Sequence, residues 1–117
     1  MSLNTMMARI HEAWAASLFG GRQAKGSGNQ WHDQIDGRQD HMSQQYAVAW
    51  DCKATLGKGI TITRAMWEKA VEQAGGEEPM LALRWYETQC LEDVGLDLTA
   101  VRAGYLARLI EAANGHA

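Results

Sequence analysis

The segment at residues 46–54 places the tightest constraint on what this chain can fold into. It reads Tyr-Ala-Val-Ala-Trp-Asp-Cys-Lys-Ala, and it is apolar up to its first charged residue. An apolar run without polar alternation is typical of a strand that is buried on both faces. The segment therefore predicts an interior strand with other elements packed on either side of it.

Residues 3–19 are predicted to form the first helix. Asn4 or Thr5 is expected to cap its beginning, and Gly20-Gly21 is expected to end it. Its expected apolar stripe consists of Met7, Ile10, Trp14 and Leu18, which recur at steps of three and four residues. Glu12 lies off that stripe among Ala8, Ala15 and Phe19, so a second face of this helix is expected to approach a sheet closely.

The remaining elements follow from local signals. Thr63 is expected to cap a helix that runs to residue 74, where Gly75-Gly76 stops it. Strands are expected at residues 22–24, 79–86 and 96–101. A last helix is predicted over residues 103–113, with Tyr105, Leu106, Leu109 and Ile110 facing inward. The order predicts an α/β fold, a mixed central sheet flanked by helices.

Length and composition limit the class of protein. A chain of 117 residues with 46% hydrophobic residues is predicted to form one domain, residues 1–117. No apolar run is long enough to span a membrane, and Arg9 and Glu12 interrupt the pattern that a signal peptide would need. Cys52 and Cys90 form no disulfide framework, so we expect a cytoplasmic protein with reduced thiols.

Asp51 and Lys53 stand where the buried run turns polar. Residues two apart on a strand point to the same face, so these two side chains are expected to project together while Cys52 points into the core. An exposed ion pair on an edge strand is the plainer interpretation. An apolar run that ends abruptly in Asp-x-Lys favours an active site instead.

Two further acidic residues complete the candidate site. Asp36 precedes the strand, and a hairpin would return it beside Asp51, although Asp33 and Asp40 are competitors and an aspartate before Gly37 is also a common turn residue. Glu12 on the first helix would support them. Carboxylate oxygens are the ligands that Mg²⁺ or Mn²⁺ prefers, and such a cation with a nearby lysine can promote hydrolysis of a phosphodiester.

These residues resemble the PD-(D/E)XK nuclease superfamily, and within it the small archaeal and phage Holliday-junction resolvases. The pieces that match are His11-Glu12-Ala13, Gly26-Ser27-Gly28, Asp36 and Asp51-Cys52-Lys53, followed by Lys58-Gly59-Ile60. The usual Glu-x-Lys of the family is Asp51-x-Lys53 here. The similarity covers roughly residues 8–113, and its specific part is the order and spacing of short motifs.

The resemblance implies a restriction-endonuclease-like fold and a metal-dependent DNA endonuclease. Glu12, Asp36, Asp51 and Lys53 would be catalytic. Glu12, Asp36, Asp51 and the backbone carbonyl of Cys52 would hold the metal. It also implies a homodimer that cuts branched DNA, in the cytoplasm of a bacterial host if a phage encodes it. The alternatives are a nicking, restriction or repair nuclease, or a DNA-binding module that has lost catalysis.

A DNA-binding surface is expected around the middle of the chain. The net charge of −3 argues weakly against a nucleic-acid partner, but basic residues gather in the middle while the last third is acidic. The residues predicted to contact DNA are Arg22, Lys25, Ser27, Arg38 and Lys58. Trp31 is expected to be a packing anchor rather than a wedge between bases. The spacing of His32, His41, Cys52 and Cys90 fits no standard zinc site.

Overall fold

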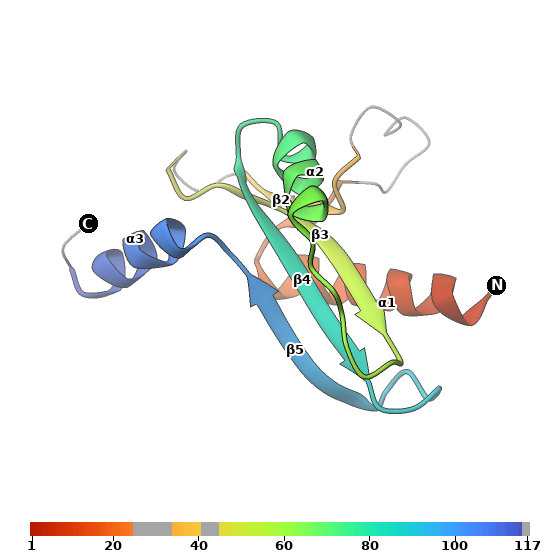
Figure 1. Cartoon of the computed structure of the whole chain (residues 1–117). Coiled ribbons are helices and arrows are strands. Elements are labelled where there is room, and N and C mark those ends of the chain that lie inside the picture. Colours follow the sequence, from red (N-terminus) through yellow and green to blue (C-terminus); the bar gives the residue numbers. More distant parts are fainter. Residues whose placement is uncertain (25–33, 41–44, 116–117) are drawn as a thin grey trace.

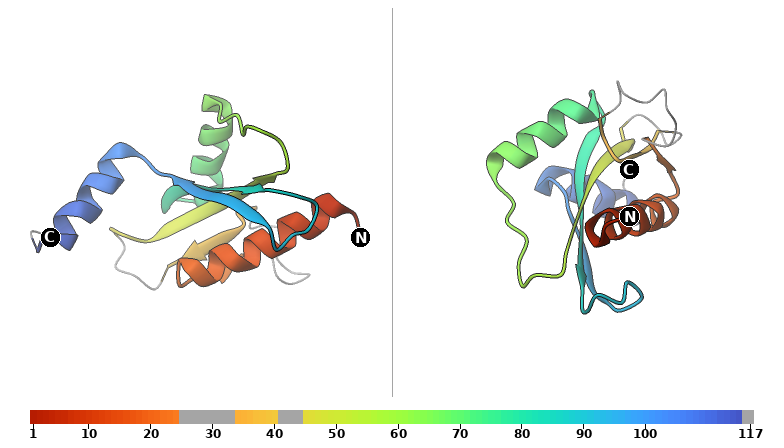
Figure 2. Two further views of the ribbon diagram at one scale, coloured as in Figure 1. Left: turned by 90° about the horizontal axis from the view of Figure 1, so that it is seen from below. Right: turned by 90° about the vertical axis from the view of Figure 1, so that its right-hand side faces the viewer.

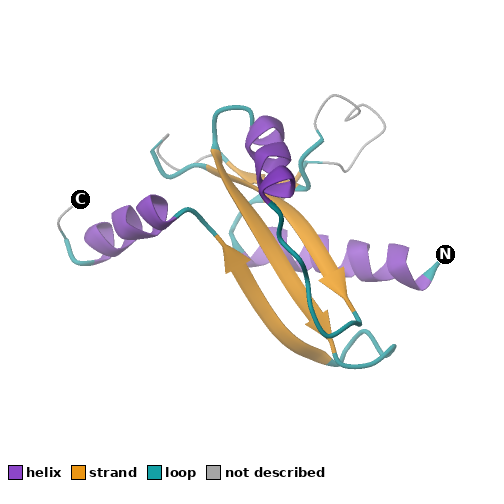
Figure 3. Ribbon diagram, viewed as in Figure 1, coloured by secondary structure: helices purple, strands orange, loops and turns teal. Residues whose placement is uncertain are grey.

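The computed structural model describes residues 1–24, 34–40 and 45–115. This part of the chain forms an α/β fold with a mixed sheet and flanking helices, as the order of sequence patterns predicted (Figure 1; Figure 3). It has five strands and three helices, and β2 was not among the predicted strands. The elements are α1 (Leu3–Leu18), β1 (Arg22–Gln23), β2 (Gly37–Gln39), β3 (Val48–Thr55), α2 (Arg64–Ala74), β4 (Glu78–Tyr86), β5 (Val94–Ala100) and α3 (Ala103–Ala113).

The strands lie in the order β1-β2-β3-β4-β5. The pair β3 and β4 is parallel and is connected through α2, whereas the other neighbours are antiparallel. The run that was predicted to be buried is thus the middle strand, and its first residues, Val48 to Trp50, are buried. β4 is interior as well, which agrees with its nearly continuous apolar sequence.

Helices cover both faces of the sheet. α1 lies on one face and α2 on the other (Figure 2). Trp50 and Met80 point toward α1 and pack with Ala15 and Ala16, while Leu81 and Leu83 on the opposite face pack against Ala70 of α2. The apolar character of the first residues of β3 follows from this two-sided cover.

Helix boundaries mostly follow the local signals. Thr63 caps α2, its hydroxyl accepting a hydrogen bond from the Met66 N–H at 3.1 Å, and Gly75 ends the helix in the left-handed region at φ 63°. The predicted cap of α1 was wrong: the hydroxyl of Ser2, rather than Asn4 or Thr5, accepts from the Thr5 N–H at 3.1 Å.

The expected apolar stripe of α1 was also wrong in part. Ile10 and Leu18 are exposed, and the buried side of the helix is Met7, His11, Ala15 and Ala16. Small side chains let the helix axis come close to the sheet, which is the approach expected for the alanine-rich face. The close fit therefore favours alanines at Ala15 and Ala16, whereas Ile10 and Leu18 remain outside.

α3 differs from its prediction because of where it lies. It continues from the end of β5 and extends beyond the sheet (Figure 1; Figure 2). Tyr105 is buried and Leu109 partly so, but Leu106 and Ile110 are about half exposed. Arg102 and Arg108 hold the helix to Glu78 at the beginning of β4, at 2.6 and 3.5 Å. No helix in the described ranges has both the length and the hydrophobicity that membrane crossing requires.

Candidate active site

The candidate site lies at the edge of β3 that β2 leaves uncovered. β2 begins at Gly37, whose partner in the register is Trp50, so no described strand pairs with this edge of β3 beyond Trp50. Asp36 stands just before β2, and its N–H donates to the Trp50 carbonyl at 3.1 Å. The hairpin thus brings Asp36 beside Asp51, as the sequence predicted.

Asp36 is held in place by the backbone of β3. Its side chain is buried, and Oδ2 accepts a hydrogen bond of 2.7 Å from the Cys52 N–H. Gly37 makes this position possible, because a Cβ there would overlap the Trp50 indole. The glycine is therefore needed for close packing beneath the site as well as for a turn.

The carboxyl groups of Asp36 and Asp51 interact directly. Burial, then a hydrogen bond with Asp51, and then the charges of Asp51 and Glu12 raise the pKa of Asp36 to about 7, against the lowering effect of the Cys52 N–H. A hydrogen bond between two carboxyl groups requires a proton on one of them, so we expect the pair to hold one proton below about pH 7. The carboxyl groups of Asp36 and Asp51 therefore lie together, and the negative charge of Glu12 acts on Asp36 as well.

Lys53 joins this group from the same strand. Its Nζ lies 3.0 Å from Asp51 Oδ2, which confirms that the two side chains share a face of β3. The Lys53 side chain is 38% exposed and that of Asp51 is 19% exposed. The ammonium group is therefore reachable from solvent while its carboxylate partner is mostly covered.

Cys52 contributes its backbone to the site. The side chain packs with the core cluster of Trp50 and Ala15, as predicted. Burial, and then the negative charges of Asp36, Glu12 and Asp51, raise the pKa of the thiol, so the sulfur is protonated and is a poor metal ligand. In a strand the N–H and C=O of one residue point to the same side, so the Cys52 carbonyl faces the uncovered edge together with the N–H that binds Asp36.

The predicted metal site stays a prediction. Within the described ranges, no group of three or more His, Cys, Asp and Glu side chains converges closely enough to hold a metal ion. The donor set is nevertheless one that suits Mg²⁺, which is commonly bound by one or two carboxylates and completed by water. Asp36, Asp51 and the Cys52 carbonyl would supply three oxygen ligands of this kind. Glu12, the fourth predicted ligand, is half-buried on α1, and its charge helps to raise the pKa of Asp36.

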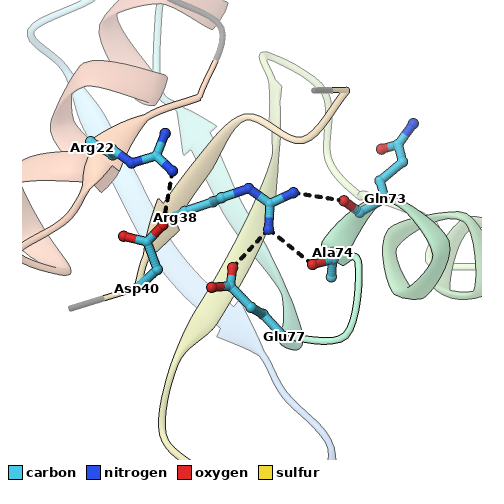
Figure 4. Close-up of polar contacts among 6 residues, drawn as sticks. All are labelled: Arg22, Arg38, Asp40, Gln73, Ala74 and Glu77. Atoms are coloured by element: carbon cyan, nitrogen blue, oxygen red, sulfur yellow. Dashed lines mark hydrogen bonds and ion pairs between the residues drawn. The ribbon is translucent and has the colours of Figure 1, made fainter. Parts of the chain in front are cut away.

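The basic residues that were predicted to contact DNA have different environments. Arg38 donates to the carbonyls of Gln73 and Ala74 at 3.0 and 2.9 Å and to Glu77 at 2.7 Å, so its guanidinium binds the C-terminal end of α2 (Figure 4). This structural role leaves no support for the predicted contact of Arg38 with DNA, which stays a prediction.

Arg22 is paired with Asp40 at 2.8 Å, with half of its side chain exposed (Figure 4). Asp40 follows β2 and pairs with Arg22, whereas Asp36 precedes β2 and contacts β3, so Asp36 is the better match for the ligand position. Lys58 is exposed in the loop after β3. The predictions that concern Lys25, Ser27, Trp31, His32, Asp33 and His41 lie outside the described residues.

His11 is a residue that the sequence reasoning missed. It is 1% exposed, and neither ring nitrogen has a hydrogen-bond partner in the described part of the chain. Burial, and then the positive charge of Arg84, lower its pKa to about 4, so the ring is neutral near pH 7. A polar residue on the alanine-rich face next to Glu12 was the signal available in the sequence.

Comparisons of this chain with models of known protein families, with curated proteins and with solved structures found no match.

Proposed function

We propose that this chain is a metal-dependent DNA endonuclease with a restriction-endonuclease-like fold. One observation carries the proposal: the carboxyl groups of Asp36 and Asp51 lie together at the uncovered edge of β3, with the Lys53 ammonium 3.0 Å from Asp51. A buried carboxyl group whose pKa is strongly raised beside a second carboxyl group, as that of Asp36 is, is typical of functional sites. Here Asp51 lies in the middle of β3, directly after the buried residues Val48 to Trp50.

Mg²⁺ or Mn²⁺ fits this arrangement. Asp36, Asp51 and the Cys52 carbonyl would hold the cation, which would take the place of the shared proton and relieve the repulsion between the two carboxylates. When bound, the cation supplies Lewis-acid polarisation of a phosphate and lowers the pKa of a water molecule. The negative charge of Glu12, which helps to raise the pKa of Asp36, would also attract the cation.

Lys53 would act on the phosphate itself. Asp51 holds its ammonium at the site, and the exposed part of the side chain can reach a phosphodiester in solvent. A fixed positive charge there stabilises the negative charge that develops on the phosphoryl oxygens, and its N–H groups can orient the attacking water. Replacing Lys53 should therefore reduce turnover more than substrate binding.

Branched DNA is the proposed substrate, and the resemblance to junction resolvases is its source. A homodimer with two-fold symmetry would present two sites to paired strands. The exposed Leu106 and Ile110 of α3 support a dimer contact on that helix. Sedimentation should show a dimer that Leu106→Glu weakens, whereas a wild-type monomer at micromolar concentration would contradict this part of the proposal.

The central experiment compares cleavage of labelled four-way junction, linear duplex and single-stranded DNA, each with Mg²⁺, with Mn²⁺ and with EDTA. We expect metal-dependent cleavage, preferentially of the junction, that Asp51→Asn and Lys53→Ala abolish. Asp93→Asn and Lys69→Ala are matched controls, because both residues are exposed and far along the chain from the site. Cleavage of none of these DNAs by the unmutated protein would refute the enzyme, and preference for linear duplex would refute only the junction.

A second candidate has one observation in its favour. Because no three ligating side chains converge in the described residues, the chain could bind DNA without cutting it. In that case the unmutated protein and Asp51→Asn should bind the junction with equal affinity, and neither should produce cleavage at any metal concentration.

A further inference from the structure

A groove lies directly beside the candidate metal site. It has a volume of about 410 Å³ and lies between the first half of α1 and the uncovered edge of β3. Its walls include Met7, Ala8 and His11 from α1, residues 52–55 of β3, and Ile60 from the following loop. We call it the β3-edge groove. Its volume is within the roughly 300–1,000 Å³ that is usual for small-ligand sites.

The groove and the candidate active site share residues. Lys53 and Cys52 line the groove, and the same two residues provide the ammonium and the backbone carbonyl of the site. Residues 52–55 extend about 10 Å along the strand at about 3.3 Å per residue. A phosphate held at Lys53 would therefore leave its neighbouring nucleotide facing this groove.

The walls of the groove are suited to a flat ring with polar edges. Met7, Ala8, Ala54 and Ile60 offer apolar surface, and a methionine sulfur packs well on an aromatic ring. His11 lies in the wall with both ring nitrogens unpartnered among the described residues. A neutral imidazole has one donor and one acceptor, and leaving both unsatisfied is unfavourable. At the strand edge, the N–H and C=O of Ala54 point the same way as those of Cys52, since the two residues are two apart.

We propose that the β3-edge groove receives an unstacked nucleobase from the nucleotide next to the cleaved phosphate. Bases carry donors and acceptors on their edges and present apolar faces, which match the two kinds of wall. A base inside a regular duplex cannot reach the groove, whereas bases at branch points, bulges and ends are released at lower cost. The inference rests on the proposed nuclease function and gives it a physical basis for choosing branched DNA.

The test measures binding in EDTA, so that it does not depend on catalysis. The probes are two duplexes that differ only at one bulged position, which carries adenine in one and an abasic site in the other. We expect the wild-type protein to bind the adenine bulge at least about fivefold more tightly, the lower end of what base stacking on protein usually contributes. Ala8→Phe and Asn4→Trp, two positions that line the groove without being buried, should remove this preference.

Two comparisons separate filling of the groove from general damage. Ala107→Phe adds the same bulk on the exposed side of α3 and should keep the preference. His11→Asn retains a donor and an acceptor and should keep most of it, whereas His11→Leu should lose it. The melting temperatures of all variants, measured by circular dichroism, show which of them are folded.

The outcomes distinguish this inference from the proposed function. Equal binding of the two bulges by the wild type, or an unchanged preference in folded Ala8→Phe and Asn4→Trp, overturns the inference even if the protein cleaves DNA. A preference that the groove variants abolish supports it even if no cleavage is found. No binding to either duplex overturns it together with the proposed substrate.

Discussion

Replacing Asp36 by asparagine should make the metal-free protein more stable at pH 8 than the wild type. The pKa of Asp36 is raised from its ordinary value of 3.8 to about 7, chiefly because the group is buried and then because it is hydrogen-bonded to Asp51. The folded protein therefore holds a proton between about pH 4 and pH 7 that the unfolded chain releases. Over this window the free energy of unfolding must fall as the pH rises.

The size of the effect follows from the shift. A rise of roughly three pKa units, at about 1.4 kcal/mol for each, corresponds to about 4 kcal/mol between low pH and pH 8. This is an upper limit, because Asp51 shares the same proton. In Asp36→Asn the new amide would still accept the hydrogen bond from the Cys52 N–H and could donate to Asp51, but it carries no charge at any pH. The contribution of this position to the pH dependence should then disappear.

The assay is urea unfolding followed by tryptophan fluorescence, with EDTA present, at intervals from pH 4 to pH 9. The quantity to compare is the difference in unfolding free energy between Asp36→Asn and the wild type. Subtraction removes the other titrating groups, including Glu78, whose lowered pKa gives the opposite slope because its stabilising effect is lost as the pH falls. We expect a difference near zero at pH 4 that grows to between about 1 and about 4 kcal/mol at pH 8. A difference that does not change with pH would refute the shared proton, and with it the main support for the site.

Three other outcomes follow from the same structure. Millimolar Mg²⁺ should stabilise the wild type at pH 8 by about 2–3 kcal/mol, which is the effect of a ligand present at a hundred times its Kd. The same Mg²⁺ should stabilise Asp36→Asn less. Equal melting temperatures of the wild type with and without metal would exclude a resident cation site. Gly37→Ala should cost about 1–3 kcal/mol in urea unfolding because its methyl group would overlap the Trp50 indole, whereas Gly59→Ala, with open space around it, should cost far less. Arg38→Gln should lower the melting temperature by several degrees because the end of α2 loses its hydrogen bonds. Arg22→Gln removes only an exposed ion pair and should not lower it. A larger loss of melting temperature in Arg22→Gln than in Arg38→Gln would contradict the structural role of Arg38.

Much of the site was visible in the sequence because it depends on strand geometry. The alternation of side chains along a strand is fixed by the backbone, so Asp51 and Lys53 had to share a face once residues 46–54 formed a strand. Asp36 was harder to identify as the partner of Asp51, since three aspartates lie in the same polar segment. Only the register of β2, with Gly37 opposite Trp50, places Asp36 next to Cys52 and Asp51 and leaves Asp40 with Arg22.

Other features could not be predicted from patterns. Arg38 looked like a surface cation because nothing in its neighbourhood along the chain shows that the end of α2 packs beside it. His11 looked like an ordinary helix residue, since burial of a polar ring depends on how closely α1 approaches β3. The outward position of Leu106 and Ile110 depends on the direction in which α3 leaves β5, and helical periodicity alone does not report which side of a helix is covered.

The sequence by itself determined the features that short-range physics controls. These are the α/β order of elements, the cap of α2 at Thr63 and its end at Gly75, the burial of the middle strand, and the common face of Asp51 and Lys53. Tertiary structure alone decided which face of α1 is buried, which aspartate meets Asp51, and that the pKa of Asp36 is raised. The reason is distance along the chain: hydrogen bonds, caps and alternation act over a few residues, whereas burial and charge coupling depend on segments that only the folded sheet brings together.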